Sequence, residues 1–167
     1  MSRFAVRVYK QSFNFASSHF LIFTDGGREE LHGHNYQVRV RVDGEVGADD
    51  MVLDFCKLKP LVKRLCDTLD HRLLLPGEHD ALTIRPDDDH LQVTFRRSDG
   101  GTDRFLFPAR DVVILPIRNT STERLAEYLG ARLVEALKVE ASHARLRALS
   151  IEVEEAGGQC GVYEVEL

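Results

Sequence analysis

The chain has 167 residues, of which 43% are hydrophobic and 29% are charged, and its formal net charge is −5. This length and composition are typical of a globular protein with one core, so we expect a single domain over residues 1–167. The negative charge argues against nucleic acid or an anionic membrane as a partner, and no stretch approaches the length of a membrane span. Three widely spaced cysteines argue against a disulfide framework, and the absence of a leader pattern makes a cytoplasmic location the default expectation.

The first strands are predicted from alternating apolar residues. They alternate over residues 4–8 and, on the opposite parity, from Phe13 to His19. Because a change of parity turns the side chains to the other face, we expect a bulge or bend near Lys10–Ser12.

Histidines gather at the start of the next strand, which ends near Asp43. His32 and His34 are two residues apart, so both rings leave the same face of a strand as the apolar residues that follow. A hairpin of about the length of residues 20–31 would bring His19 beside them. Three neutral imidazoles with an open fourth position are the ligand set of a catalytic zinc site.

Two adjacent glutamates precede these histidines. Glu30 shares the parity of His32, provided that the strand reaches back that far, whereas Glu29 does not. The alternative interpretation of the pair is a solvated charge pair in a loop.

Helical spacing of leucines and valines predicts one helix from Leu58 to Leu69, with Pro60 tolerable only if the helix has just begun. Asp70 and His71 follow at its end, where a histidine also suits the helix dipole. A capping box at Thr120–Glu123 predicts the start of a second helix.

Residues 76–118 separate the two helices and are predicted to contain an inserted hairpin, because apolar residues alternate on both sides of the turn at Asp99–Gly101. We expect this insertion to be a structural elaboration at a subunit contact. His79 and His90, on either side of an acidic run, are interpreted as solvated.

Residues 149–155 and 162–167 are predicted to form the last two strands, and Glu155 shares the parity of the apolar residues in the first of them. A carboxylate that faces inward needs hydrogen-bond donors. The alternative is that the strand ends before Glu155.

Ordered motifs of the chain resemble the 6-pyruvoyltetrahydropterin synthase and 6-carboxytetrahydropterin synthase superfamily, closely over residues 4–75 and more loosely over 119–167. The motifs are Phe15–His19, Leu31–Tyr36, Met51–Phe55 with Leu58 and Lys59, and Leu69–His71. The resemblance implies an α+β tunnelling fold (ββααββ), with an antiparallel sheet, two helices on one face and, here, the inserted hairpin. It also implies an oligomeric barrel, a homohexamer built from two trimers.

The same resemblance implies roles for individual residues. His19, His32 and His34 are expected to bind Zn2+. Asp70 and His71 are expected to work with the catalytic base, while Ser121, Thr122 and Glu155 are expected to hold a small-molecule pterin substrate.

One departure concerns the catalytic cysteine that the synthases carry a few residues before the first of the paired histidines, because residues 24–31 contain no cysteine. A glutamate two residues before the histidine resembles the type III variant, and Glu30 occupies that position. We therefore expect a zinc-dependent lyase that cleaves the side chain of 7,8-dihydroneopterin triphosphate to 6-hydroxymethyl-7,8-dihydropterin, for folate or pterin synthesis.

Three alternatives to this reaction stay open. The chain could have 6-pyruvoyltetrahydropterin or 6-carboxy-5,6,7,8-tetrahydropterin synthase activity. It could be a non-catalytic pterin-binding protein, or a zinc hydrolase outside pterin chemistry.

Overall fold

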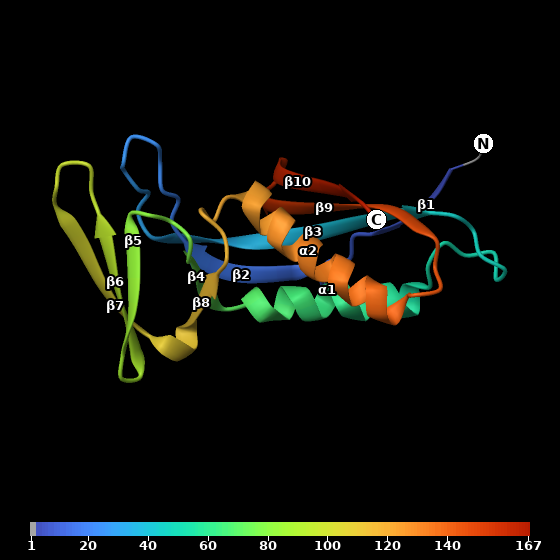
Figure 1. Ribbon diagram of the computed structural model, residues 1–167, viewed down its shortest axis with the longest axis horizontal. Coiled ribbons are helices and arrows are strands. Elements are labelled where there is room, and N and C mark those ends of the chain that lie inside the picture. The colour runs from blue at the N-terminus through green and yellow to red at the C-terminus, as the bar shows by residue number, and fades with distance from the viewer. Residues whose placement is uncertain (1–2) are drawn as a thin grey trace.

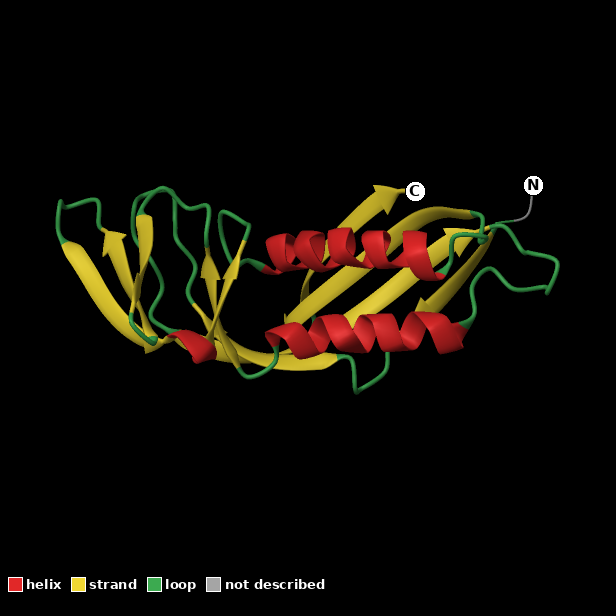
Figure 2. Cartoon of the chain, turned by 60° about the horizontal axis from the view of Figure 1, so that its bottom comes forward, coloured by secondary structure: helices red, strands yellow, loops and turns green. Residues whose placement is uncertain are grey.

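The computed structural model describes residues 3–167, in which two helices lie on one face of a seven-stranded sheet and a smaller sheet lies beyond its end (Figures 1 and 2). The strands of the main sheet are β1 (Phe4–Val8), β2 (Asn14–His19), β3 (His32–Gly44), β4 (Arg72–Pro76), β8 (Val112–Leu115), β9 (Leu146–Ala156) and β10 (Gln159–Glu166). The helices are α1 (Phe55–Leu69) and α2 (Thr122–Glu140). The small sheet consists of β5 (Leu82–Asp87), β6 (His90–Arg96) and β7 (Thr102–Pro108), and a 3-10 turn (Ala109–Asp111) follows it.

The main sheet has the order β10-β9-β3-β2-β4-β8, with β1 paired to the far end of β3. The α+β class and the two helices on one face are confirmed, but the prediction of an antiparallel sheet is wrong. β4 pairs in parallel with both β2 and β8. Parallel neighbours need a crossover connection, and between β4 and β8 the small sheet provides it.

The predicted change of parity after the first strand is confirmed. Val8 and Phe13 are both buried although they differ in parity, and a turn at residues 11–12 separates β1 from β2. This irregularity lets both short strands pair with the single long strand β3 and still direct their apolar side chains to the helices.

Both helices begin at other residues than predicted. The first begins at Phe55, where the Asp54 side chain accepts a hydrogen bond from Cys56 N–H, so Pro60 lies inside the helix. Burial of its apolar face holds the helix together across the proline. The second helix is capped by Ser121 and not by Thr120, which is fully buried.

Two clusters of buried residues make up the core. The larger lies between the main sheet and the two helices. The smaller lies beneath the small sheet and joins it to the segment after β2; its buried members are Phe20, Ile22, Leu73, Leu75, Val93 and Phe95. None of the helices in residues 3–167 is long and apolar enough to cross a membrane.

The hairpin predicted around the turn at Asp99–Gly101 is confirmed as β6 and β7, but the insertion also contains β5, which pairs with the other edge of β6. The alternation of Leu82 and Ile84 is the signal for β5. The insertion packs against its own chain through the smaller core cluster.

Candidate metal centre and active site

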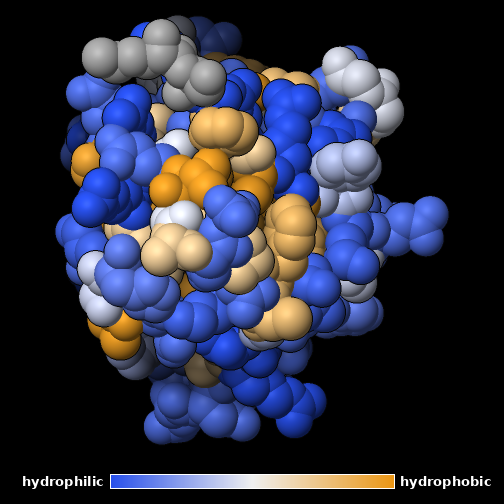
Figure 3. Space-filling model, turned by 90° about the vertical axis from the view of Figure 1, so that its right-hand side faces the viewer, coloured by the Kyte–Doolittle hydropathy of each residue, from blue (hydrophilic) through white to orange (hydrophobic). Residues whose placement is uncertain are grey.

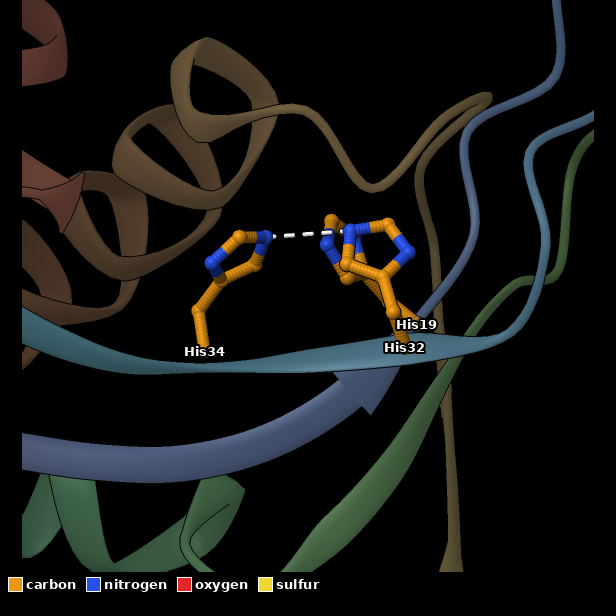
Figure 4. A group of neighbouring side chains, drawn as sticks. All are labelled: His19, His32 and His34. Carbon is orange, nitrogen blue, oxygen red and sulfur yellow. Dashed lines mark hydrogen bonds between the residues drawn. The ribbon is translucent and has the colours of Figure 1, made fainter.

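Three histidines meet where β2 ends and β3 begins. His19 and His32 are directly paired across the two antiparallel strands, and His34 lies two residues further along β3 on the same face. One ring nitrogen from each histidine lies within 4.8 Å of the others, and Figure 4 shows the three rings turned toward one another. The clustering predicted from strand parity is therefore confirmed.

Backbone carbonyls hold the outer nitrogens of two of these rings. The Nδ1 of His19 lies 3.1 Å from the carbonyl oxygen of Thr120, and the Nδ1 of His32 lies 2.8 Å from that of Glu30. With Nδ1 as the donor in each case, Nε2 keeps its lone pair. The Nε2 atoms of His32 and His34 lie 3.0 Å apart.

The electrostatics around His19 favour a neutral ring. Burial, with the neighbouring His32 and His34, lowers the pKa of His19 from its ordinary 6.5 to about 4. Neutral imidazoles whose outer N–H groups bond to carbonyls are the donors that zinc sites use. The three histidines thus fit a zinc ion.

Glu29, and not Glu30, directs its carboxylate toward this cluster. The Oε2 of Glu29 lies 3.9 Å from the Nε2 of His32 and accepts a hydrogen bond from Leu21 N–H at 3.0 Å. The premise that placed Glu30 inward is wrong, because β3 begins only at His32 and parity does not extend back into the loop. Glu30 is exposed and contributes its backbone carbonyl to His32.

Asp70 and His71 form a pair away from the three histidines. The Nδ1 of His71 lies 2.9 Å from Oδ2 of Asp70, whose Oδ1 accepts a hydrogen bond from Ala16 N–H at 2.8 Å. The bond from Ala16, with the contact to His71, holds the pKa of Asp70 below its usual value. The His71 side chain is 84% exposed, and among residues 3–167 no hydrogen bond or ring contact joins it to the three histidines.

The residues before α2 divide into a capping group and a buried group. Ser121 caps the helix by accepting from Arg124 N–H, and Thr122 is its first residue. The unexpected residue is Thr120, whose hydroxyl donates to the Phe20 carbonyl at 3.0 Å and lies 3.2 Å from Nδ1 of His19. The sequence did not predict this role, because Thr120 also fits the first position of a capping box, where a threonine is expected to cap the helix.

Glu155 lies on β9, so the alternative that the strand ends before this residue is wrong. Glu155 is half-buried, and no hydrogen bond occupies its carboxylate within residues 3–167. Burial and the charges of Glu155 and Glu29 raise the pKa of Tyr36, whose hydroxyl donates to the Nε2 of His19 at 3.0 Å. Tyr36 therefore lies in the field of both carboxylates.

None of the chain's cysteines joins the histidine cluster in the described part of the chain. Cys66 is a buried residue of α1, and burial raises the pKa of its thiol to about 12, while Cys56 and Cys160 are exposed. The carboxylate of Glu29 therefore lies next to the histidines, where the resemblance to the synthases would imply a cysteine thiol.

The sequence is similar to known proteins over nearly its whole length. The family model for 6-pyruvoyl tetrahydropterin synthase matches residues 7–166. A Methanocaldococcus jannaschii protein provisionally named 6-carboxy-5,6,7,8-tetrahydropterin synthase is 31% identical over 150 residues, which are 89% of this chain and 88% of that protein. A Pyrococcus furiosus dihydroneopterin monophosphate aldolase is 48% identical over 46 residues, 28% of this chain and 40% of the other.

Solved structures extend the similarity to three dimensions. The 6-pyruvoyl tetrahydropterin synthase of Plasmodium vivax matches with a TM-score of 0.91 and 32% identity, over the whole of both chains. A variant of the P. vivax protein, with a glutamate described as a catalytic residue replaced by alanine, matches with a TM-score of 0.90 and 31% identity, again over both whole chains. This chain therefore belongs to the 6-pyruvoyl tetrahydropterin synthase family and is a pterin-processing lyase of that family.

Proposed function

We propose that this protein is a zinc-dependent lyase of the type III kind, which uses a glutamate in place of the family's cysteine. Its proposed reaction cleaves the side chain of 7,8-dihydroneopterin triphosphate and gives 6-hydroxymethyl-7,8-dihydropterin. The single observation that carries this proposal is the carboxylate of Glu29, 3.9 Å from the Nε2 of His32. The catalytic glutamate of the P. vivax protein and the aldolase name of the P. furiosus protein support it.

In this proposal His19, His32 and His34 bind the zinc. A zinc ion held there lowers the pKa of the substrate hydroxyls and stabilises the negative charge that develops on them. The rings of His19 and His32 suit this role, because each Nδ1 donates to a backbone carbonyl and each Nε2 therefore keeps a lone pair that can bind a metal.

Glu29 would act as the general base. It removes the proton from the hydroxyl on the departing side of the bond that breaks. The carbon–carbon bond then cleaves, and that hydroxyl becomes the carbonyl of the departing fragment. The electron pair passes to the carbon attached to the ring, where the ring's imine takes up the charge until a proton returns to that carbon. A carboxylate suits the first step because it accepts a proton without forming a covalent bond to the substrate.

Asp70 and His71 are proposed to return that proton. Their separation from the histidine cluster within one chain, and the exposure of His71, suit a site completed by a second copy of the chain. Glu155 is proposed to bind the pterin edge, since its half-buried carboxylate has no hydrogen-bond partner within residues 3–167 and can accept two hydrogen bonds. Ser121 and Thr122 are proposed to contact the pterin beside it.

One other reaction has specific support, since the M. jannaschii relative carries the name of a 6-carboxy-5,6,7,8-tetrahydropterin synthase. The name of the P. furiosus relative likewise supports dihydroneopterin monophosphate, in place of the triphosphate, as the substrate. The deciding experiment incubates zinc-loaded protein with 7,8-dihydroneopterin triphosphate or monophosphate and identifies the pterin product by mass. Protein stripped of metal by a chelator serves as the blank.

The first prediction separates the two glutamates. Glu29→Gln should lower turnover at least about 100-fold, the lower end of what a general base contributes. Zinc content and pterin binding should stay unchanged, because a base acts on the transition state. The matched variant Glu30→Gln should remain active, since the Glu30 contact to His32 is made by its backbone. Loss of activity in Glu30→Gln alone would restore Glu30 as the base.

A further inference from the structure

The segment that carries Glu29 is a short loop folded back on itself between β2 and β3. Ile22 and Arg28 form an antiparallel bridge across it, and Glu29 N–H donates to the Leu21 carbonyl at 2.9 Å. On one side, the Asn119 side chain bonds to both the N–H and the carbonyl of Ile22. Figure 1 shows the other side of this loop, in blue, next to the small sheet.

Arg28 connects this loop to the small sheet. Its Nε and Nη2 atoms lie 3.0 and 2.9 Å from Oδ2 of Asp103 on β7. Its remaining Nη1 donates to the carbonyl oxygen of Glu29 at 2.7 Å. One guanidinium therefore joins the inserted sheet to the peptide unit of the proposed base.

The environment of Arg28 fixes the guanidinium in place. Its Cζ lies 5.4 Å from the ring centre of Phe20 and 4.9 Å from that of Phe105, which are distances of cation–π contact. The side chain of Arg28 is 15% exposed and that of Asp103 is 23% exposed, so solvent screens their ion pair less than a surface pair. Arg97 also donates to Asp103, through Nη1 at 2.8 Å, and steadies this carboxylate.

The loop and the small sheet also fit closely at their tips. Gly26 has a φ of +82°, and a Cβ built on it would lie 2.7 Å from the Cβ of Ser98 in the turn between β6 and β7. The loop can approach the turn so closely only because residue 26 has no side chain.

We propose that Arg28 and Asp103 are positioning residues for the reaction, and that the inserted sheet serves to hold the Glu29 loop against the histidine cluster. This inference rests on the proposed role of Glu29. Arg28 is suited to this function because its planar fork contacts two acceptors at once, which a lysine ammonium on a flexible stem does not reproduce. The insertion thereby acts within its own chain on the active site.

The test uses the full-length, zinc-loaded protein with Asp103→Asn, which removes the charge that anchors Arg28. Amide hydrogen exchange of Leu21 and Glu29, which are bonded to each other, reports the order of the loop without any turnover. The expected result is faster exchange at both amides and a fall in kcat of about 10- to 100-fold, in line with the cost of misplacing a catalytic group. Zinc content and KM should change little.

Two further variants make the test sharp. Asp99→Asn removes a charge from the turn just before β7, where Asp99 contacts Arg97 and not Arg28, and it should leave exchange and kcat unchanged. Arg28→Lys keeps the charge and much of the packing among the aromatic rings but loses the planar fork that contacts two acceptors. It should therefore show the effect expected of Asp103→Asn, even if Asp103→Asn itself folds poorly.

Unchanged exchange of the loop in Asp103→Asn and Arg28→Lys would overturn the inference, as would faster exchange with an unchanged kcat. Failure of the proposed function would be recognised separately. In that case Glu29→Gln would keep full activity, whatever the behaviour of the Asp103 variant.

Discussion

A single buried imidazole, that of His19, sets the electrostatic character of the candidate metal centre. The side chain is 1% exposed, with Tyr36 on one ring nitrogen and Thr120 on the other. These contacts satisfy the neutral ring, whereas a positive charge there would face His32 and His34 in a dry environment. The same features that prepare His19 for a metal therefore make its protonation costly.

A pH dependence of stability follows for the metal-free protein. His19 titrates at about 4 in the folded chain and at 6.5 in the unfolded chain, so the unfolded state binds more protons between these values. Stability from His19 is complete above pH 6.5 and is lost as the pH falls toward 4, by up to about 3 kcal/mol. Urea unfolding of chelator-treated protein across this range measures the effect.

His19→Gln should flatten that dependence, because glutamine does not titrate. His143→Gln, a change at an exposed histidine, is the control and should leave the slope as it is. A slope that is the same in all three proteins would show that another group is responsible.

At the scale of the elements, the start of α2 is fixed by its packing on β10. Gly161 lies against the backbone of Thr122 and Glu123, and a Cβ built on it would overlap both. The first turn of α2 carries Ser121 and Thr122, and Thr120 just before it bonds to His19. One glycine thus lets a strand approach the helix end that supports the site.

Gly161→Ala should therefore lower the free energy of unfolding by about 1–3 kcal/mol, the usual cost of forcing an atom into a packed region. Gly157→Ala is the matched change, because a Cβ there meets nothing within 4 Å, and its effect should be small. Thermal or urea unfolding compares the two. Equal stability of both variants would mean that β10 moves away from α2 at little cost.

At the scale of the whole molecule, the main sheet ends on two open strands, β10 and β8. Val162 and Ile114 on these edges are 48% and 47% exposed. Open edges with apolar side chains favour pairing with another chain. Figure 3 shows a further apolar group, at the end of the molecule away from the small sheet, where Val46, Met51 and Ala144 line a hollow.

We therefore expect a symmetric oligomer, by resemblance a hexamer of two trimers, and sedimentation should find a species several times the 18.9 kDa of one chain.

If His71 serves a neighbouring site, inactive Glu29→Gln and inactive His71→Asn chains assembled together should regain part of the activity. A monomer at micromolar concentration, or mixed oligomers that stay inactive, would contradict this expectation.

The sequence by itself determined the histidine cluster and most of the element order. Strand parity is a local property, and it correctly placed His32 and His34 on one face and Glu155 within a strand. Periodicity and turn residues likewise predicted both helices and the hairpin of β6 and β7. The tertiary structure decided what lies outside regular elements or depends on distant segments.

Glu29 and Glu30 illustrate this limit. They lie in a loop, where side-chain direction follows from contacts to Leu21 and, through Arg28, to Asp103, which is 75 residues further along the chain. The parallel pairing of β4 and the contact of Thr120 with His19 also join remote segments. No local pattern encodes such contacts, because they arise only when packing brings the segments together.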